Sequence, residues 1–419
     1  MVILHLNHYQ IKPIRNLVIQ PFMKELNKHG IENIYFDAQE LRNGGFYSRI
    51  IFLILSAKVF VEKYLKNAIT RIHFNFYNVL EQIPVISSHR ILKTIKKNPD
   101  VIILYWISGS FNIKTVYKLQ KKTGAKVYWY FMDKAPMTGG CHYTWHCKEY
   151  ITSGCKNCCA FKFNFLSFIA SENFKYRQKY FGKLNITALS PTTETSELIH
   201  KSILFQGKDE RYIPIGIDQT TFIQREIDVL EFCNIKREAG KTYFLVGAND
   251  INDKRKGLHL FINSLKLIKE SNKNLFNQVL ILIIGKFKYN PFNNIEVENV
   301  TLGYVNQSQL VQLYNFVDAY VCPSVEDSGP LMVNQALCCG TPVIAFNTGV
   351  ARDLIEDKHA GYLASILDIE DFAKGLIMIL NSEKNERRFY RKSNRDKTIE
   401  KVGINNSVQK MMDYLIEKP

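Results

Sequence analysis

The sequence has no apolar run long enough to cross a membrane. The longest candidate, residues 50–61, is interrupted by Lys58 and falls short of the roughly 20 residues that a spanning helix needs. No low-complexity tract or solenoid-length repeat is present, and 46% of the residues are hydrophobic, so a disordered or repeat protein is excluded. The first residues are typical of a sheet strand, so we expect no secretory signal peptide.

Acidic residues are scarce in the first half of the chain. Residues 1–211 hold 30 Lys plus Arg against 14 Asp plus Glu, a net charge of +16, whereas residues 212–419 hold 25 of each. The usual partners of such a basic region are nucleic acid, an anionic membrane or an anionic small molecule. Nucleic acid is disfavoured, because no zinc-finger, RRM or helix-turn-helix pattern accompanies the charge. Residues 46–66 combine apolar and basic side chains, which fits either a helix in a membrane interface or a buried core helix.

The 419 residues exceed the size of one core and suit two domains of about 200 residues. Strand-like apolar runs alternate with amphipathic stretches, a pattern that predicts an α/β fold with doubly wound parallel sheets. We expect an N-terminal domain at 1–211, a second domain at 212–395 and a C-terminal helix at 396–419 that packs back toward the first domain.

One segment near the C-terminus carries most of the functional information. An apolar strand, residues 319–322, leads into a loop with Glu326, and a helix is expected after Ser328 before a second strand at 343–346. Open α/β sheets bind ligands at the carboxyl ends of such strands. A helix start there would offer backbone N–H groups to a phosphate. The plain alternative is a βαβ unit whose Glu-Asp pair only caps the helix.

This segment resembles the donor-binding motif of the family 4 glycosyltransferases, enzymes of the GT-B fold that use nucleotide-sugars. The family motif is a Glu, seven residues, a second Glu, and then A-x-x-x-G-T-P-V-[IV]-A. Glu326 matches the first Glu, and Asn334 stands in the place of the second. The resemblance implies that Glu326 contacts the transferred sugar as a catalytic residue and that Asn334 lies near the nucleotide ribose. The surrounding loop, Ser328, Gly329, Pro330 and Leu331, would bind sugar and phosphate.

The resemblance continues upstream of this segment. Residues 212–222 are similar to the P-x-G-I-D-x-x-x-F hinge that leads into the donor-binding domain. Lys256 matches the Lys of the following K-G loop, and Arg255 can replace the family's Arg, whose usual position is Ala248. In the family these cations hold the donor diphosphate, where negative charge builds as the sugar bond breaks.

Five of the nine cysteines fall within an insertion at residues 137–159. Their spacing, C-x5-C-x7-C-x2-C, could place four sulfur ligands around a structural Zn²⁺, and disulfides are the rival interpretation. The four expected ligands are Cys141, Cys147, Cys155 and Cys158. The T-G-G-C-H-Y insertion also resembles a subgroup of the family from bacterial polysaccharide clusters.

Two positions depart from the resemblance. The subgroup carries an H-D pair where this chain has Met132-Asp133, which leaves Asp133 as the candidate catalytic group there. The first βα loop lacks the family's glycine-rich turn. The side chains of His8 or Lys12 could contact the ligand there instead, but we expect both to face solvent.

Together the resemblance implies two Rossmann-like domains facing a cleft, with the donor on the C-terminal domain. It implies a retaining glycosyltransferase that needs no catalytic metal or other cofactor. The expected acceptor is a glycan or a polyprenyl-diphosphate-linked glycan of O-antigen or capsule assembly, at the inner face of the cytoplasmic membrane. The basic N-terminal half would meet that anionic surface. A nucleotide-sugar epimerase and a non-catalytic GT-B subunit are the alternatives.

Overall fold

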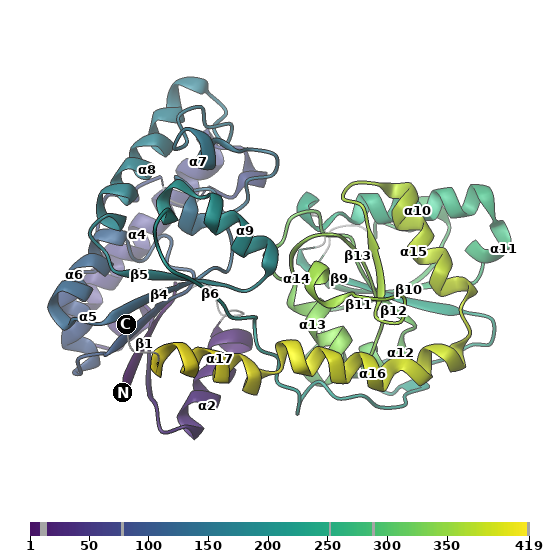
Figure 1. The fold of residues 1–419 in the computed structure, drawn as a ribbon. Coiled ribbons are helices and arrows are strands. Elements are labelled where there is room, and N and C mark those ends of the chain that lie inside the picture. The colour runs from purple at the N-terminus through teal and green to yellow at the C-terminus, as the bar shows by residue number, and fades with distance from the viewer. Residues whose placement is uncertain (9–14, 77–78, 251–252, 287–289, 417–419) are drawn as a thin grey trace. The chain divides into compact units, whose positions relative to one another are not determined.

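The structure, a computed structural model, describes residues 1–8, 15–76, 79–250, 253–286 and 290–416 (Figure 1). They form two compact units, Met1–Pro214 with Val408–Pro419, and Ile215–Ser407. The division lies three residues beyond the expected 211/212 boundary, and the roles expected for the two domains stay predictions. Residues 396–416 are not one helix, because Gly403 takes an extended backbone and pairs with Ile217 between two helices.

The N-terminal unit is built on a parallel six-stranded sheet of order β2-β1-β3-β4-β5-β6. Its strands are β1 (Val2–Leu6), β2 (Glu32–Phe36), β3 (Val101–Leu104), β4 (Lys126–Tyr130), β5 (Ile186–Ser190) and β6 (Glu210–Tyr212). Its helices are α2 (Gln20–Lys28), α3 (Gln39–Arg42), α4 (Phe46–Ile69), α5 (Ser88–Ile95), α6 (Ile113–Thr123), α7 (Glu149–Thr152), α8 (Phe168–Phe181) and α9 (Thr193–Lys201). The strands β3 and β4 are almost wholly buried, as expected for a parallel sheet with covered faces.

The C-terminal unit holds a second parallel sheet, of order β11-β10-β9-β12-β13-β14. Its strands are β9 (Thr242–Asp250), β10 (Val279–Lys286), β11 (Glu298–Gly303), β12 (Ala319–Cys322), β13 (Val343–Phe346) and β14 (Gly361–Ala364), beside a small antiparallel pair, β7 (Val229–Leu230) and β8 (Ile235–Lys236). Its helices are α10 (Leu258–Ser271), α11 (Lys273–Phe276), α12 (Gln307–Phe316), α13 (Leu331–Cys338), α14 (Gly349–Leu354), α15 (Ile369–Asn381) and α16 (Lys384–Val402), and α17 (Ile404–Ile416) passes from this unit into the other.

Alternate residues of these strands serve two separate cores. On β9, Tyr243 and Leu245 pack with α12 and α13, whereas Phe244 and Val246 pack with α10 and α15 on the opposite face (Figure 1). Because side chains alternate across a strand and both faces are covered, the central strands β9, β10, β12 and β13 are largely apolar. The predicted α/β fold with doubly wound parallel sheets is confirmed.

Helix α4 covers the N-terminal core with one side only. Leu55, Glu62 and Lys66 are buried, whereas its outer side exposes a row of residues spaced three and four apart. This row, called the α4 stripe, consists of Phe46, Ile50, Leu53, Ala57, Phe60 and Tyr64. The buried interpretation of residues 46–66 is therefore confirmed for one side of the helix, and the membrane-interface interpretation stays a prediction for the exposed side. Within the part of the chain that the structure describes, no helix combines the length and apolar character needed to cross a membrane.

Candidate active site

The order of the C-terminal sheet reverses between β9 and β12. From β9 the chain proceeds outward to β10 and β11, and it then returns to place β12 on the other side of β9. At such a switch point the loops at the carboxyl ends of the two central strands part in opposite directions, which makes room for a ligand. The loops in question are those after β9, with residues 253–257, and after β12, with residues 323–330.

The two loops contact one another through a glycine. Gly257 has a φ of +66°, and a Cβ atom there would lie 1.7 Å from the Pro323 carbonyl oxygen. A side chain is therefore excluded, and only glycine adopts this backbone at little cost. Beside it, the Val325 N–H donates to the Arg255 carbonyl oxygen at 2.9 Å. These contacts fix the short helix Lys254–Lys256 against the loop that carries Glu326.

The two expected cations converge on an aspartate that sequence reasoning did not single out. The Lys256 ammonium lies 2.6 Å from Asp327 Oδ2, and the Arg255 guanidinium lies 2.7 Å from the same oxygen. Arg255 also donates to the Glu326 carbonyl oxygen at 2.9 Å and pairs with Asp253 at 3.2 Å. Burial acts to raise the pKa of the Asp327 carboxyl, but Lys256 and then Arg255 outweigh it and hold that pKa well below its ordinary value.

The loop after Glu326 differs from expectation in where its helix begins. α13 starts at Leu331 rather than directly after Ser328, and Pro330 precedes it without a side-chain cap. Ser328 and Gly329 are half-buried, and Gly329 N lies 3.3 Å from Asp327 Oδ1. Pro supplies no N–H, so Pro330 cannot join the expected cradle of backbone donors. Glu326 itself is 7% exposed.

Asn334 lies on the first turn of α13 and is almost completely buried. Its amide nitrogen donates to the Ile215 carbonyl oxygen at 3.2 Å, in the hinge segment. Its side-chain oxygen Oδ1 has no hydrogen-bond partner among the described residues. A buried acceptor without a donor is costly, and a ligand hydroxyl would satisfy it.

The N-terminal sheet has its own switch point, between β1 and β3. There the His8 imidazole lies 2.5 Å from the Ser110 hydroxyl, so the expectation that His8 faces solvent is wrong. The Glu62 carboxylate of α4 and the His8 ring both lie beside Gly109. A Cβ atom on Gly109 would lie 3.5 Å from the His8 ring and 3.8 Å from the Glu62 carboxylate. Burial raises the pKa of Glu62 to about 7, although Lys58 opposes the shift. Lys12 lies outside the described residues.

Asp133 follows β4 and forms a buried pair with His142. The two side chains are 2.7 Å apart, and the Trp106 ring stacks on the imidazole with 4.0 Å between ring centroids. The other Asp133 oxygen accepts the Ala135 N–H at 2.7 Å. Met132 stands where the subgroup has the His of its H-D pair. His142, from the T-G-G-C-H-Y insertion nine residues downstream of Asp133, contacts that aspartate instead. Asp133 and Glu326 belong to different units.

The cysteine-rich insertion forms part of the N-terminal core. Cys141, Cys155 and Cys158 are buried, and Cys147 is half-buried. A hydrogen bond with Cys158, together with burial, raises the pKa of the Cys141 thiol. Burial, together with a hydrogen bond to Cys147, raises the pKa of the Cys159 thiol to about 12. Across the described residues, however, no group of three or more His, Cys, Asp or Glu side chains is arranged to hold a metal ion. This geometry gives the predicted zinc site no support, and zinc binding stays a prediction.

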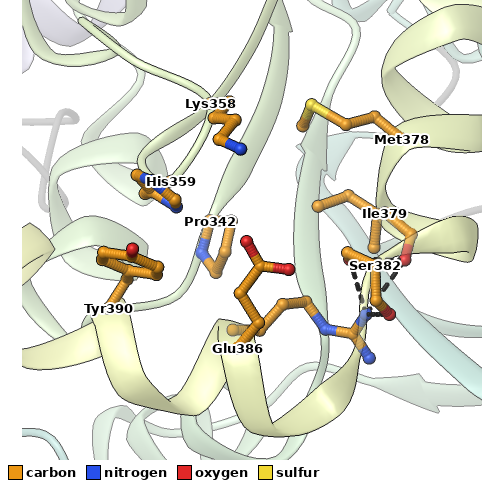
Figure 2. Close-up of a pocket in the computed structure, with 9 residues that line it drawn as sticks. Pro342, Lys358, His359, Met378, Ile379, Ser382, Glu386 and Tyr390 are labelled. Atoms are coloured by element: carbon orange, nitrogen blue, oxygen red, sulfur yellow. Dashed lines mark hydrogen bonds between the residues drawn. The ribbon is translucent and has the colours of Figure 1, made fainter.

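A separate pocket of about 120 Å³ lies at the amino end of β13, whereas the loops around Glu326 follow the carboxyl ends of β9 and β12 (Figure 2). Its lining includes Lys358 and Glu386, and the rings of His359 and Tyr390 stack on one another at 3.4 Å. Arg387 is held by Ser382 and by the Ile379 carbonyl oxygen. None of the residues expected from the sequence lines this pocket.

Comparisons with known proteins relate the chain, and the segment that carries this site, to glycosyltransferases. The profile of the family described as Glycosyl transferases group 1 matches residues 234–396. The putative colanic acid biosynthesis glycosyl transferase WcaC of Escherichia coli K12 is 24% identical over 66% of this chain and 67% of its own. The phosphatidyl-myo-inositol mannosyltransferase of Mycolicibacterium smegmatis is 26% identical over 50% of each chain. Three curated relatives are matched over only 40%, 50% and 41% of their own length.

Solved structures match nearly the whole chain. The sucrose-phosphate synthase of Thermosynechococcus elongatus superposes with a TM-score of 0.64 at 13% identity, covering 99% of this chain and 98% of that one. The Anabaena protein Alr3699/HepE, solved in complex with UDP and glucose, has a TM-score of 0.62 at 13% identity and covers 99% of both chains. Identities this low show the fold alone. The chain therefore has the GT-B fold with two Rossmann-like domains, and its residues 234–396 match the profile of the group 1 glycosyl transferases.

Proposed function

We propose that this protein is a retaining, metal-independent glycosyltransferase that moves a sugar from a nucleotide-sugar to a growing surface polysaccharide. The acceptor is a glycan or a polyprenyl-diphosphate-linked glycan of O-antigen or capsule type. The protein would work at the inner face of the cytoplasmic membrane as a peripheral protein. The observation that carries the proposal lies at the switch point between β9 and β12. There Arg255 donates to the Glu326 carbonyl oxygen, and Lys256 and Arg255 both pair with the next residue, Asp327.

These residues would bind three parts of the nucleotide-sugar donor. Lys256 and Arg255 would bind the diphosphate, Glu326 the hydroxyls of the transferred sugar, and the Asn334 oxygen a ribose hydroxyl. The group 1 match over 234–396 and the UDP bound by Alr3699/HepE support this assignment. No protein-held metal is needed to neutralise the diphosphate if two cations already do so.

Transfer breaks the bond between the anomeric carbon and the diphosphate oxygen and forms one from that carbon to an acceptor oxygen. The acceptor proton passes to the leaving diphosphate, so the chain need not supply a nucleophile. Lys256 and Arg255 act on the charge that grows on the leaving group and therefore stabilise the transition state more than the bound donor. In the N-terminal unit, Asp133 with His142, and His8 with Ser110, are the polar groups for the acceptor.

The α4 stripe supports the proposed membrane attachment. Leu53 is 65% exposed and Phe60 73% exposed, and Tyr47 and Ile54 are exposed beside the stripe. The single acidic residue of α4, Glu62, is buried, whereas Arg49 and Lys63 are exposed. An apolar row bordered only by cations suits an anionic bilayer better than a second α4, because coiled-coil partners pair opposite charges beside the seam. Exposed Phe163, Phe165 and Phe168 extend the apolar surface near the end of α4. The chain is held there by a hydrogen bond from the Lys162 N–H to the Ile69 carbonyl oxygen.

The donor site is tested by a screen of purified protein against a panel of nucleotide-sugars, followed by two variants. Glu326→Ala should chiefly lower kcat, and Lys256→Ala should also weaken nucleotide binding, each by about ten- to a hundredfold. Lys254→Ala is the matched control, because Lys254 is exposed on the same short helix and should change little. Unchanged kinetics in both site variants would remove the assignment.

The same screen separates the alternative functions. An epimerase would convert nucleotide-sugars without any acceptor, and a non-catalytic subunit would bind nucleotide without consuming donor. The replacement of the second motif Glu by Asn334 is the observation that favours a non-catalytic subunit. Acceptor-dependent release of UDP or GDP would exclude both.

Membrane attachment is tested with vesicles. Full-length protein should bind vesicles that contain phosphatidylglycerol, and the binding should weaken as salt is raised, since exposed charges are screened over about 8 Å at physiological ionic strength. Leu53→Glu with Phe60→Glu should abolish binding. Phe389→Glu is the matched control, because Phe389 is equally exposed, at 78%, but lies on α16 in the other unit. Equal binding to pure phosphatidylcholine vesicles would contradict the electrostatic part of the proposal.

A further inference from the structure

The cations assigned to the donor diphosphate already have an anion. Lys256 and Arg255 contact the same oxygen of Asp327, at 2.6 and 2.7 Å. The three side chains are largely shielded from water, with exposed fractions of 24% for Lys256, 8% for Arg255 and 15% for Asp327. A carboxylate and a phosphate offer equivalent oxygens to an ammonium or a guanidinium. Asp327 therefore takes the coordination that one oxygen of a diphosphate would take.

The Asp327 carboxylate can leave without a change in the main chain. Two contacts fix the backbone around it. The Asp327 carbonyl oxygen packs so closely on Gly349 that a Cβ atom there would lie 2.2 Å from it, and the Val325 N–H donates to the Arg255 carbonyl oxygen. The carboxylate is held by the two cations and, at 3.3 Å, by the Gly329 N–H. Rotation about its side-chain bonds would release Lys256 and Arg255 while Glu326 stays in place.

We infer that Asp327 is an internal counter-anion, which the donor diphosphate displaces from Lys256 and Arg255 and which returns to them when the nucleotide leaves. The inference rests on the donor site proposed above. While no nucleotide is bound, Asp327 compensates the shielded charge of Lys256 and, together with Asp253, that of Arg255. When nucleotide binds, part of the interaction energy is used to break the two ion pairs, so the product nucleoside diphosphate is held less tightly and released sooner.

A fixed positioning role for Asp327 gives the opposite expectation. If its carboxylate only orients Lys256 toward the diphosphate, the loss of Asp327 would weaken nucleotide binding. If it competes with the diphosphate, its loss should strengthen binding by about ten- to a hundredfold, the range for one competing charged hydrogen bond. The direction of the change therefore distinguishes the two roles.

The experiment is a calorimetric titration of wild-type protein, Asp327→Asn and Asp253→Asn with UDP, GDP, ADP and inorganic pyrophosphate. Asp253→Asn is the matched control, since the Asp253 carboxylate also pairs with Arg255 but is half-exposed and forms no ion pair with Lys256 among the described residues. We expect tighter binding for Asp327→Asn alone. Equal or weaker binding would overturn the inference, and the absence of nucleotide binding in every protein would overturn the donor site itself.

A second measurement does not depend on the stability of the variant. A structure of the wild-type protein with bound UDP should show the Asp327 carboxylate more than about 3.5 Å from the Lys256 nitrogen, beyond hydrogen-bond distance. The diphosphate oxygens should take its place. Nucleotide bound beside an intact Lys256–Asp327 pair would overturn the inference even if the asparagine variant does not fold.

Discussion

The buried carboxylate of Glu62 should make the N-terminal unit less stable as the pH rises. Burial raises the pKa of Glu62 from 4.5 to about 7 in the folded protein. Between these pH values the folded state keeps a proton that the unfolded chain has lost, so the free energy of unfolding falls as the pH increases. The stabilisation that this bound proton gives the folded state is complete below pH 4.5 and is lost above pH 7.

The size of the effect follows from the two pKa values. At 1.36 kcal/mol for each pH unit, the difference between 4.5 and 7 amounts to about 3 kcal/mol. Glu62→Gln removes the charge and keeps an oxygen that can accept the Leu80 N–H, as Oε1 does at 2.9 Å. Above pH 7 the variant should therefore be more stable than the wild type by up to about 3 kcal/mol, which raises the melting temperature of a unit of this size by about 6–12 °C.

The assay is thermal unfolding of wild-type protein and Glu62→Gln from pH 4.5 to pH 8. The two curves should coincide at the acidic end, where both side chains are neutral and nearly isosteric, and separate as the pH rises. Glu40→Gln, at an exposed position on α3, should show no such separation. A constant difference between wild type and Glu62→Gln at every pH would show that the carboxyl does not titrate as described.

Three further predictions concern single features. Asn334→Ala should weaken UDP binding about two- to tenfold and leave pyrophosphate binding unchanged in titrations, whereas equal losses would refute the ribose contact. Gly257→Ala should destabilise the protein by at least about 1 kcal/mol more than Gly240→Ala in denaturant unfolding, because both have positive φ but only Gly257 would clash; equal effects would contradict this. Elemental analysis should find about one zinc ion per chain if the insertion cysteines bind metal, and a metal-free, fully folded protein would contradict that.

The central strands could be predicted from sequence, and the edges could not. β10 is a continuous apolar run because both of its faces are buried. β2 has only one buried residue, and β11 has none, so neither presents such a run. In α4 the helical spacing was visible, but apolar residues occupy two sides of that helix. Spacing alone cannot show which side faces the core.

The candidate site was predicted only as far as its motif reaches. Glu326, Lys256 and Asn334 could be chosen as site residues from their positions in the motifs. The structure brings the loop of Lys256 into contact with the loop of Glu326. The contact of Lys256 with Asp327 and that of Asn334 with Ile215 join residues 71 and 119 positions apart. Such contacts depend on how strands and loops are placed in three dimensions. The pairing of Asp133 with His142 was also missed, although Asp133 and the T-G-G-C-H-Y insertion were each singled out.

The passage of α17 from one unit to the other has a practical consequence for fragment studies. Val408 and Met411 are completely buried, Arg211 lies over the Tyr414 ring at 5.3 Å, and Lys410 lies over the Tyr212 ring at 5.2 Å. A fragment that ends at residue 214 would leave a groove uncovered, and a fragment of 212–419 would carry an apolar helix end into water. We expect the two pieces of the N-terminal unit to complement one another, so that a synthetic peptide of the last helix binds and stabilises fragment 1–214.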